Sequence, residues 1–139
     1  MELKLSIPEE PQAMARAKTT SKCINGRWKT WSYTPTPSKL AMESLKCAIY
    51  TKVKEQFPAY MPLELTVTFY RTKPDSSKDA MPVRKPDLSN LIKGVEDVMN
   101  KIVYPDDAAI VKEVLVKKWS TTGHGYIEIE LKEYKDDSI

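Results

Sequence analysis

The sequence predicts an α+β fold, a single domain in which two main helices pack on a mixed or antiparallel β-sheet. Three observations favour this class. Segments in which apolar and polar residues alternate, as they do in half-buried strands, occur near both ends of the chain and in its middle. Two segments with apolar residues at helical spacing lie among them. The last two strand-like segments return on each other across a turn, so the helices are expected to pack on a sheet.

The composition is that of a globular protein. The 139 residues suit one domain, residues 1–139, which is large enough to bury a core without disulfides or a structural metal. The chain is 41% hydrophobic and 29% charged, and no apolar run is long enough to cross a bilayer. The N-terminal residues lack the pattern of a secretory signal, so we expect a cytoplasmic protein with no membrane partner. The acidic C-terminal tail, about residues 132–139, is expected to fray.

A strand and a hairpin are expected in the first third of the chain. Glu2–Ile7 alternates apolar and polar residues as a half-buried strand does. Two short extended segments follow, around Ala13–Thr19 and Arg27–Tyr33, and they are joined near Asn25-Gly26. This dipeptide favours the two-residue turn of a hairpin because both of its residues tolerate positive φ.

One helix and one strand come next. A threonine or serine cap beside Pro37 opens a helix that we expect to run to about Gln56. Its apolar residues recur at every fourth position and form one stripe: Leu45, Ile49 and Val53. After Phe57-Pro58, the segment Leu63–Tyr70 alternates more strictly than any other and predicts a strand.

The second half of the chain begins with a long loop from Arg71 to Pro86, a length that more often indicates function than padding. A short helix with one buried face is expected after it, because six apolar residues fall at helical spacing: Leu88, Leu91, Ile92, Val95, Val98 and Met99. Ile102–Asp107 then forms a connection. Ile110–Trp119 and Tyr126–Leu131 are expected to pair as a final antiparallel hairpin.

Positive charge is concentrated in one part of the chain. The stretch from residue 11 to residue 42 has no acid and carries six basic residues with three aromatic residues among them: Arg16, Lys18, Lys22, Arg27, Lys29 and Lys39, with Trp28, Trp31 and Tyr33. Lysine and arginine displace counterions from phosphates, and flat rings stack on exposed bases. The predicted DNA contacts are Arg16, Lys18, Arg27 and Lys29, joined by Arg84 and Lys85 of the long loop. A solvated basic face whose tryptophans belong to the core explains the stretch equally well.

Polar residues that the core pattern does not explain gather around the second helix. They are Asp87, Asn90, Lys93 and Asp97, outside its apolar arc, and Asp106 and Asp107 after it. Adjacent aspartates repel each other, so a cation often holds such a pair, and Mg²⁺ prefers one or two carboxylates completed by waters and phosphate oxygens. A lysine such as Lys93 would add a donor to the charge of a scissile phosphate. The spacing therefore favours magnesium-dependent phosphodiester cleavage.

Five of these six residues also have a purely structural explanation. Asp87 stands where a helix cap is common, and its carboxylate could accept hydrogen bonds from the amides of the first turn. The pair Asp106-Asp107 could be only an exposed turn. Lys93 and Asp97 are spaced i,i+4 and could form a surface ion pair.

The run from Lys85 to Lys93 reads K-P-D-L-S-N-L-I-K, and Asp97 and the pair Asp106-Asp107 follow it before a strand that ends at Trp119. This pattern resembles the RusA family of Holliday-junction resolvases. That family carries K-x-D-x-D-N-x-x-K at a helix start, a further aspartate on the helix and a double aspartate downstream. The resemblance is specific over this stretch and weaker upstream of it.

The resemblance implies a role for each matching residue. Asp87, Asp106 and Asp107 would hold the metal ion, and Asp87, Lys93 and Asp107 would be catalytic. Three further residues would support the site: Ser89, Asn90 and Asp97. The resemblance also implies Mg²⁺ as cofactor, with Mn²⁺ able to substitute for it. The expected protein is a homodimer that binds branched DNA, especially four-way junctions, and makes paired symmetric nicks.

Ser89 is where the sequence departs from the family pattern, which usually has its second aspartate at that position. A serine is neutral and a poor direct ligand of Mg²⁺, so the site has one fewer negative charge. An alternative is therefore a RusA-fold protein that binds branched DNA but cuts it weakly or not at all. A metal-dependent nuclease that acts on flaps, forks or nicked duplex is a third hypothesis.

Overall fold

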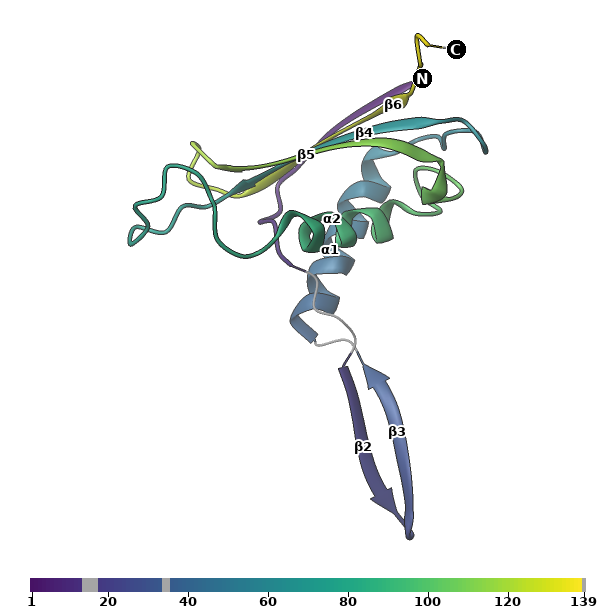
Figure 1. Ribbon diagram of the computed structural model, residues 1–139, viewed down its shortest axis with the longest axis vertical. Helices are drawn as coiled ribbons and strands as arrows, with labels where there is room; N and C mark the ends of the chain where they lie inside the picture. The colour runs from purple at the N-terminus through teal and green to yellow at the C-terminus, as the bar shows by residue number, and fades with distance from the viewer. Residues whose placement is uncertain (14–17, 34–35, 139) are drawn as a thin grey trace.

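The computed structural model describes residues 1–13, 18–33 and 36–138. The elements, in chain order, are β1 (Glu2–Ile7), β2 (Lys18–Ile24), β3 (Arg27–Tyr33), α1 (Thr36–Lys52), β4 (Leu63–Arg71), α2 (Leu88–Met99), the short 3-10 helix η1 (Asp107–Ala109), β5 (Ile110–Trp119) and β6 (Tyr126–Glu133). Figure 1 shows both helices on one face of a four-stranded sheet, while the hairpin β2–β3 stands apart from that body. The predicted α+β class is confirmed.

The main sheet is mixed, with the strand order β1-β6-β4-β5. β6 runs antiparallel to both β1 and β4, whereas β4 and β5 run parallel. β4 is a central strand, and the four apolar side chains that alternate along it are all 1% exposed or less: Leu63, Leu65, Val67 and Phe69. The apolar residues of the predicted alternation therefore lie on the inner face of the sheet.

The predicted hairpin of the last two strands is wrong, because β4 lies between β5 and β6. Val67 of β4 pairs with Leu115 of β5 on one side and with Ile129 of β6 on the other. The connection after β5 passes the end of β4, where the Ser120 amide donates to the carbonyl oxygen of Arg71 at 2.7 Å. β4 is the most regularly apolar strand, and a central position supplies both of its edges with backbone partners.

The N-terminal hairpin is confirmed. β2 covers Lys18–Ile24 and so extends beyond the predicted end at Thr19, while residues 14–17 of the predicted segment lie outside the described residues. The turn of the hairpin explains the register. Asn25 and Gly26 have φ of 53° and 76°, as a tight hairpin turn requires, and each arm extends seven residues from that turn.

Two other boundaries also differ from the sequence prediction. α1 ends at Lys52 rather than near residue 56, and Phe57 is buried beyond it with its amide bonded to the carbonyl oxygen of Val103 at 2.8 Å. The expected frayed tail starts later, since Lys132 and Glu133 are paired in β6 and the Tyr134 amide donates to a main-chain oxygen of the body. Backbone pairing of β6 with its two neighbouring strands overrides the acidic composition there.

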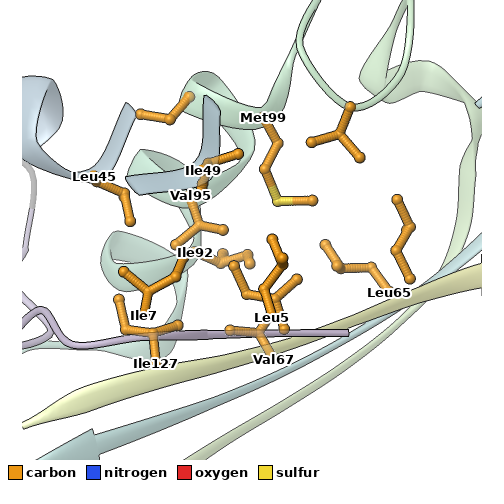
Figure 2. Close-up of a cluster of buried hydrophobic side chains, with 14 of the residues drawn as sticks. Leu5, Ile7, Leu45, Ile49, Leu65, Val67, Ile92, Val95, Met99 and Ile127 are labelled. Atoms are coloured by element: carbon orange, nitrogen blue, oxygen red, sulfur yellow. The ribbon is translucent and has the colours of Figure 1, made fainter. Parts of the chain in front are cut away.

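The core lies between the helices and the inner face of the sheet (Figure 2). Five of the six apolar positions predicted for α2 are buried, and the sixth, Leu88, packs against the cluster. α1 contributes Leu45 and Ile49, and β1 contributes Leu5 and Ile7. Each such side chain contributes about 1.5–3 kcal/mol to folding. This burial fixes α2 against the sheet and turns its polar face outward. Within the described ranges, no helix is long and apolar enough to span a membrane.

Candidate active site

The start of α2 places Asp87 at its N-cap position, with φ −74° and ψ 152°. The backbone carbonyl of Asp87 accepts hydrogen bonds from the amides of Asn90 and Leu91, both at 3.1 Å. The Asp87 carboxylate itself makes no capping hydrogen bond. The capping explanation for this aspartate is therefore wrong, and its carboxylate is exposed at the amide-rich end of a helix, which favours anions.

The polar residues predicted on α2 lie away from its buried face. Ser89, Lys93 and Asp97 are exposed and follow one another at i,i+4 spacing, so they share one side of the helix, while Asn90 is half-buried. Among the described residues, the ion pairs within 4.0 Å do not include Lys93 with Asp97. The surface ion pair between Lys93 and Asp97, which their spacing allowed, therefore does not form.

The two residues of the double aspartate, Asp106 and Asp107, have different surroundings. Asp106 caps η1, and its Oδ1 accepts from the Ala108 amide at 3.1 Å. This hydrogen bond, together with one to Asp107, lowers the pKa of Asp106. Asp107 is half-buried, and burial, the neighbouring Asp106 and the more distant charge of Asp97 raise its pKa. The turn explanation therefore accounts for Asp106 but leaves the crowded carboxylate of Asp107 unexplained.

Tyr104 joins this cluster and was missed by the sequence reasoning. Its ring is fully buried, and its hydroxyl has no hydrogen-bond partner within the described part of the chain. Burial and the charges of Asp107 and Asp97 raise its pKa. A buried polar atom without a partner indicates a site for a further polar group, and this hydroxyl lies within electrostatic reach of two carboxylates. In the sequence, the feature that could have indicated this role is the position of Tyr104 directly before Pro105 and the aspartate pair.

The carboxylates partly fit a magnesium ion. In the ranges that the structure describes, no three His, Cys, Asp or Glu side chains gather closely enough to hold a metal. What the fold brings together is Asp106 and Asp107, with Asp97 near enough to act on Asp107. Mg²⁺ needs only one or two carboxylates when waters and phosphate oxygens complete its shell. The carboxylates of Asp106 and Asp107 therefore suit Mg²⁺. That Asp87 binds the same ion stays a prediction.

The loop that leads to Asp87 is anchored by the end of β5, which is a second feature that the sequence reasoning missed. The ammonium of Lys117 donates to the carbonyl oxygens of Arg84 and Pro86, both at 3.0 Å. Trp119 donates its indole N–H to the carbonyl oxygen of Asp79 at 3.0 Å. The only signal in the sequence was the Lys117-Lys118-Trp119 strand end that the family resemblance includes.

The predicted DNA contacts lie in two places. Arg84 and Lys85 are exposed and line a pocket of about 570 Å³ with Arg71, Lys78 and Trp119. The Arg84 guanidinium also pairs with Asp79 at 2.9 Å, which raises the arginine's pKa. The other predicted contacts belong to the hairpin region: Arg27 and Lys29 are exposed on β3, Lys18 begins β2, and Arg16 lies outside the described residues.

Comparisons with known proteins agree with the residue pattern. The family model for Endodeoxyribonuclease RusA matches residues 8–132. The chain is similar to the crossover junction endodeoxyribonuclease rusA of Lactococcus phage r1t, with 39% identity over 93 residues that cover 65% of this chain and 70% of the phage protein. It is also similar to the uncharacterized protein YqaN of Bacillus subtilis (strain 168), with 32% identity over 63 residues that span 44% of each protein. The chain therefore belongs to the RusA family of endodeoxyribonucleases.

Proposed function

We propose that the chain resolves four-way DNA junctions by paired, magnesium-dependent nicks. The observation that carries the proposal is the carboxylate of Asp107, which is half-buried, directly follows Asp106 in the chain, and has its pKa raised by burial, by that neighbour and by the charge of Asp97. Such crowding is unfavourable without a cation and favourable with one. Membership of an endodeoxyribonuclease family supports the nuclease chemistry, and the phage relative's name supports the junction substrate.

In this proposal the carboxylates of Asp87, Asp106 and Asp107 would hold the metal ion. A bound Mg²⁺ supplies the activation of a water and the neutralisation of charge on the scissile phosphate. Lys93, exposed in the second turn of α2, donates to a phosphate oxygen as negative charge develops there. Asn90 and Asp97 orient the site, and Asp97 does so through its charge on Asp107.

The paired nicks require two active sites, and we propose a homodimer that supplies one to each strand. A closed two-fold pair matches the symmetry of a four-way junction. β5 supports this proposal because it is an edge strand of the main sheet and exposes two apolar side chains, Val111 at 57% and Val114 at 40%. An exposed apolar edge is a common place for another chain to pair.

The second candidate is a branched-DNA-binding protein that cuts weakly or not at all. Ser89 favours it, because this exposed first-turn residue leaves α2 without an acidic side chain in its first turn. A site with fewer carboxylates binds Mg²⁺ less tightly. The two functions share a substrate and differ only in catalysis.

One experiment separates these functions. The pure protein is incubated with a labelled four-way junction, a fork and a plain duplex, with and without Mg²⁺. Paired symmetric nicks on the junction alone, and only with Mg²⁺, would support resolution. Binding to the junction without nicks would support the second candidate, and preferential cutting of the fork would identify a different branched substrate.

A further inference from the structure

The hairpin β2–β3 has two chemically different faces. Residues opposite each other in an antiparallel pair point to the same face, and successive residues of a strand point to opposite faces. The register pairs Thr20 with Trp31, Lys22 with Lys29 and Ile24 with Arg27. These six residues therefore share one side, which we call the basic face because it carries Lys22, Arg27 and Lys29, all on the turn side of Trp31.

The opposite side, which we call the neutral face, has no charged residue among those the structure describes from 19 to 31. Cys23 pairs with Trp28 there, and the hydroxyls of Ser21 and Thr30 lie 2.9 Å apart. Three cations thus segregate to one side of a ribbon that has only two sides. A hairpin that served merely as a soluble extension would have no need for this segregation.

The basic face is open to a partner. Every residue from Ser21 to Trp31 is exposed, including 46% of Trp31 and 38% of Ile24. Figure 1 shows the hairpin projecting away from the helices and the main sheet. The prediction that its tryptophans belong to the core is therefore wrong for both Trp28 and Trp31. A large aromatic surface left in water beside cations indicates a binding surface.

The arrangement of charge points to an anionic partner. Lys22 and Lys29 stand directly opposite each other in the register, and Arg27 lies one pair closer to the turn on the same face. Like charges at opposed positions destabilise a hairpin. The chain offers no acid between residues 11 and 42 to offset this repulsion. Phosphates bound along the face would remove it.

We infer that the basic face binds an unpaired DNA strand, with Trp31 stacked on a base and Lys22, Arg27 and Lys29 against the flanking phosphates. An indole needs an exposed base to stack on, and paired DNA hides the faces of its bases, so the surface suits single-stranded rather than duplex DNA. The inference rests on the proposed function in one respect, that the chain acts on branched DNA, where bases at the branch point can leave the stack.

Trp28 and Trp31 give a matched test because they lie on the same strand but on opposite faces. The affinity of the full-length protein for a labelled short oligothymidylate is measured by fluorescence anisotropy in EDTA, which prevents cleavage. Trp31→Ala should weaken binding at least about fivefold, the loss of one base stack. Trp28→Ala should change it less than about twofold, and Trp31→Tyr, which keeps a ring, should recover most of the affinity.

An abasic oligonucleotide of the same length separates stacking from charge. Trp31→Ala should bind it as the wild type does, because there is no base to stack on. Neutralising Lys22 and Lys29 to glutamine should weaken binding to both oligonucleotides and reduce the slope of log affinity against log salt by about 1.4. Unchanged thermal melting would show that the exposed substitutions leave the body folded.

Three results would overturn the inference: wild-type affinity in Trp31→Ala, a larger loss in Trp28→Ala, or a Trp31→Ala loss that persists on the abasic strand. Junction cleavage in Mg²⁺ is measured on the same preparations. A wild type that binds oligothymidylate through Trp31 but leaves junctions uncut would contradict the proposed function alone. A wild type that cuts junctions while Trp31→Ala binds normally would contradict this inference alone.

Discussion

The ammonium of Lys117 donates a hydrogen bond to the carbonyl oxygen of Pro86 at 3.0 Å, which ties β5 to the backbone directly before α2. The same ammonium donates to the carbonyl oxygen of Arg84 at 3.0 Å. From the end of β4, the Arg71 guanidinium donates to the carbonyl oxygen of Lys85 at 3.3 Å. Two cations on neighbouring strands therefore hold the segment that carries the first aspartate of the candidate site.

Lys117→Met should impair catalysis without contact to the reacting atoms. The substitution keeps the aliphatic stem but frees the loop, and a small displacement of Asp87 should lower the cleavage rate roughly ten- to a hundredfold. The free energy of unfolding should fall by about 1 kcal/mol, because charged hydrogen bonds to backbone are lost. Cleavage rates at several Mg²⁺ concentrations, together with urea unfolding, measure both effects.

Lys118→Met is the matched control, since Lys118 is the exposed neighbour on the same strand. It removes the same charge, and within the described part of the chain the strand side chains that donate hydrogen bonds to the loop are those of Lys117, Trp119 and Arg71 instead. Equal losses of cleavage in the two variants would show that charge matters rather than position, and an unaffected Lys117→Met would refute the positioning role.

Asp107→Asn should abolish magnesium-dependent cleavage while junction binding survives. The amide keeps the shape of the carboxylate but removes the charge, and the metal's contribution of several kcal/mol implies a loss of at least about a hundredfold. Asp106→Asn should be milder, because Asn can still accept the hydrogen bond from the Ala108 amide. Cleavage time courses and gel-shift affinities distinguish these outcomes, and full activity in Asp107→Asn would exclude Asp107 as a ligand.

The local patterns in the sequence were sufficient for the helices and for most strands. Strict alternation predicted β4, and apolar residues at helical spacing predicted α2 together with its polar outer face. These are properties of one segment at a time. Strand order is different, because β5 pairs with β4 rather than with β6, and that choice depends on how three strands share the core.

The same distinction applies to the site. Asp87, Lys93 and the aspartate pair were predicted from spacing and family pattern. The electrostatic effect of Asp97 on Asp107 depends on how the connection after α2 folds back. The role of Lys117 depends on its contacts with Arg84 and Pro86, which are distant from it in the sequence. The two faces of the hairpin depend on the register, and the Asn25-Gly26 turn that sets this register was predicted from the sequence.

Salt dependence tests whether the hairpin region contacts phosphates. Each phosphate contact on duplex DNA contributes about 0.9 to the slope of log affinity against log salt. Neutralising Arg16, Lys18, Arg27 and Lys29 together should therefore reduce the slope for a four-way junction by up to about 3.6. Lys46→Gln and Lys52→Gln, exposed on α1, serve as controls of equal charge type. An unchanged slope in the fourfold variant would mean that these residues form only a solvated surface.

The edge of β5 should govern dimer formation. Val111→Lys with Val114→Lys places two charges on this exposed apolar edge, which should shift the protein toward monomer in light scattering and reduce paired nicking to single nicks. Leu40→Lys, at a 60% exposed position on α1, is the control for adding charge at an apolar surface position. A wild type that is monomeric at micromolar concentration, both free and on DNA, would exclude the homodimer.

Ser89 decides between the two proposed functions, because it occupies the position where the family pattern has an aspartate. It is exposed in the first turn of α2, two residues after Asp87, so a longer side chain has room. That turn holds no acid, and an added carboxylate at the positive end of the helix should stabilise it by about 0.3–1 kcal/mol. Ser89→Asp should therefore fold at least as well as the wild type.

The carboxylate of Ser89→Asp should also lower the Mg²⁺ concentration needed for half-maximal cleavage, because it adds a negative charge beside Asp87. Ser89→Asn has the same shape without the charge and should not lower it. Ser89→Ala tests the opposite idea, that the hydroxyl already holds a water of the site and the wild type is fully competent. Magnesium titrations of the four proteins separate the cases. If Ser89→Ala loses cleavage and Ser89→Asp gains no metal affinity, the serine works as it stands and is not a weakened ligand.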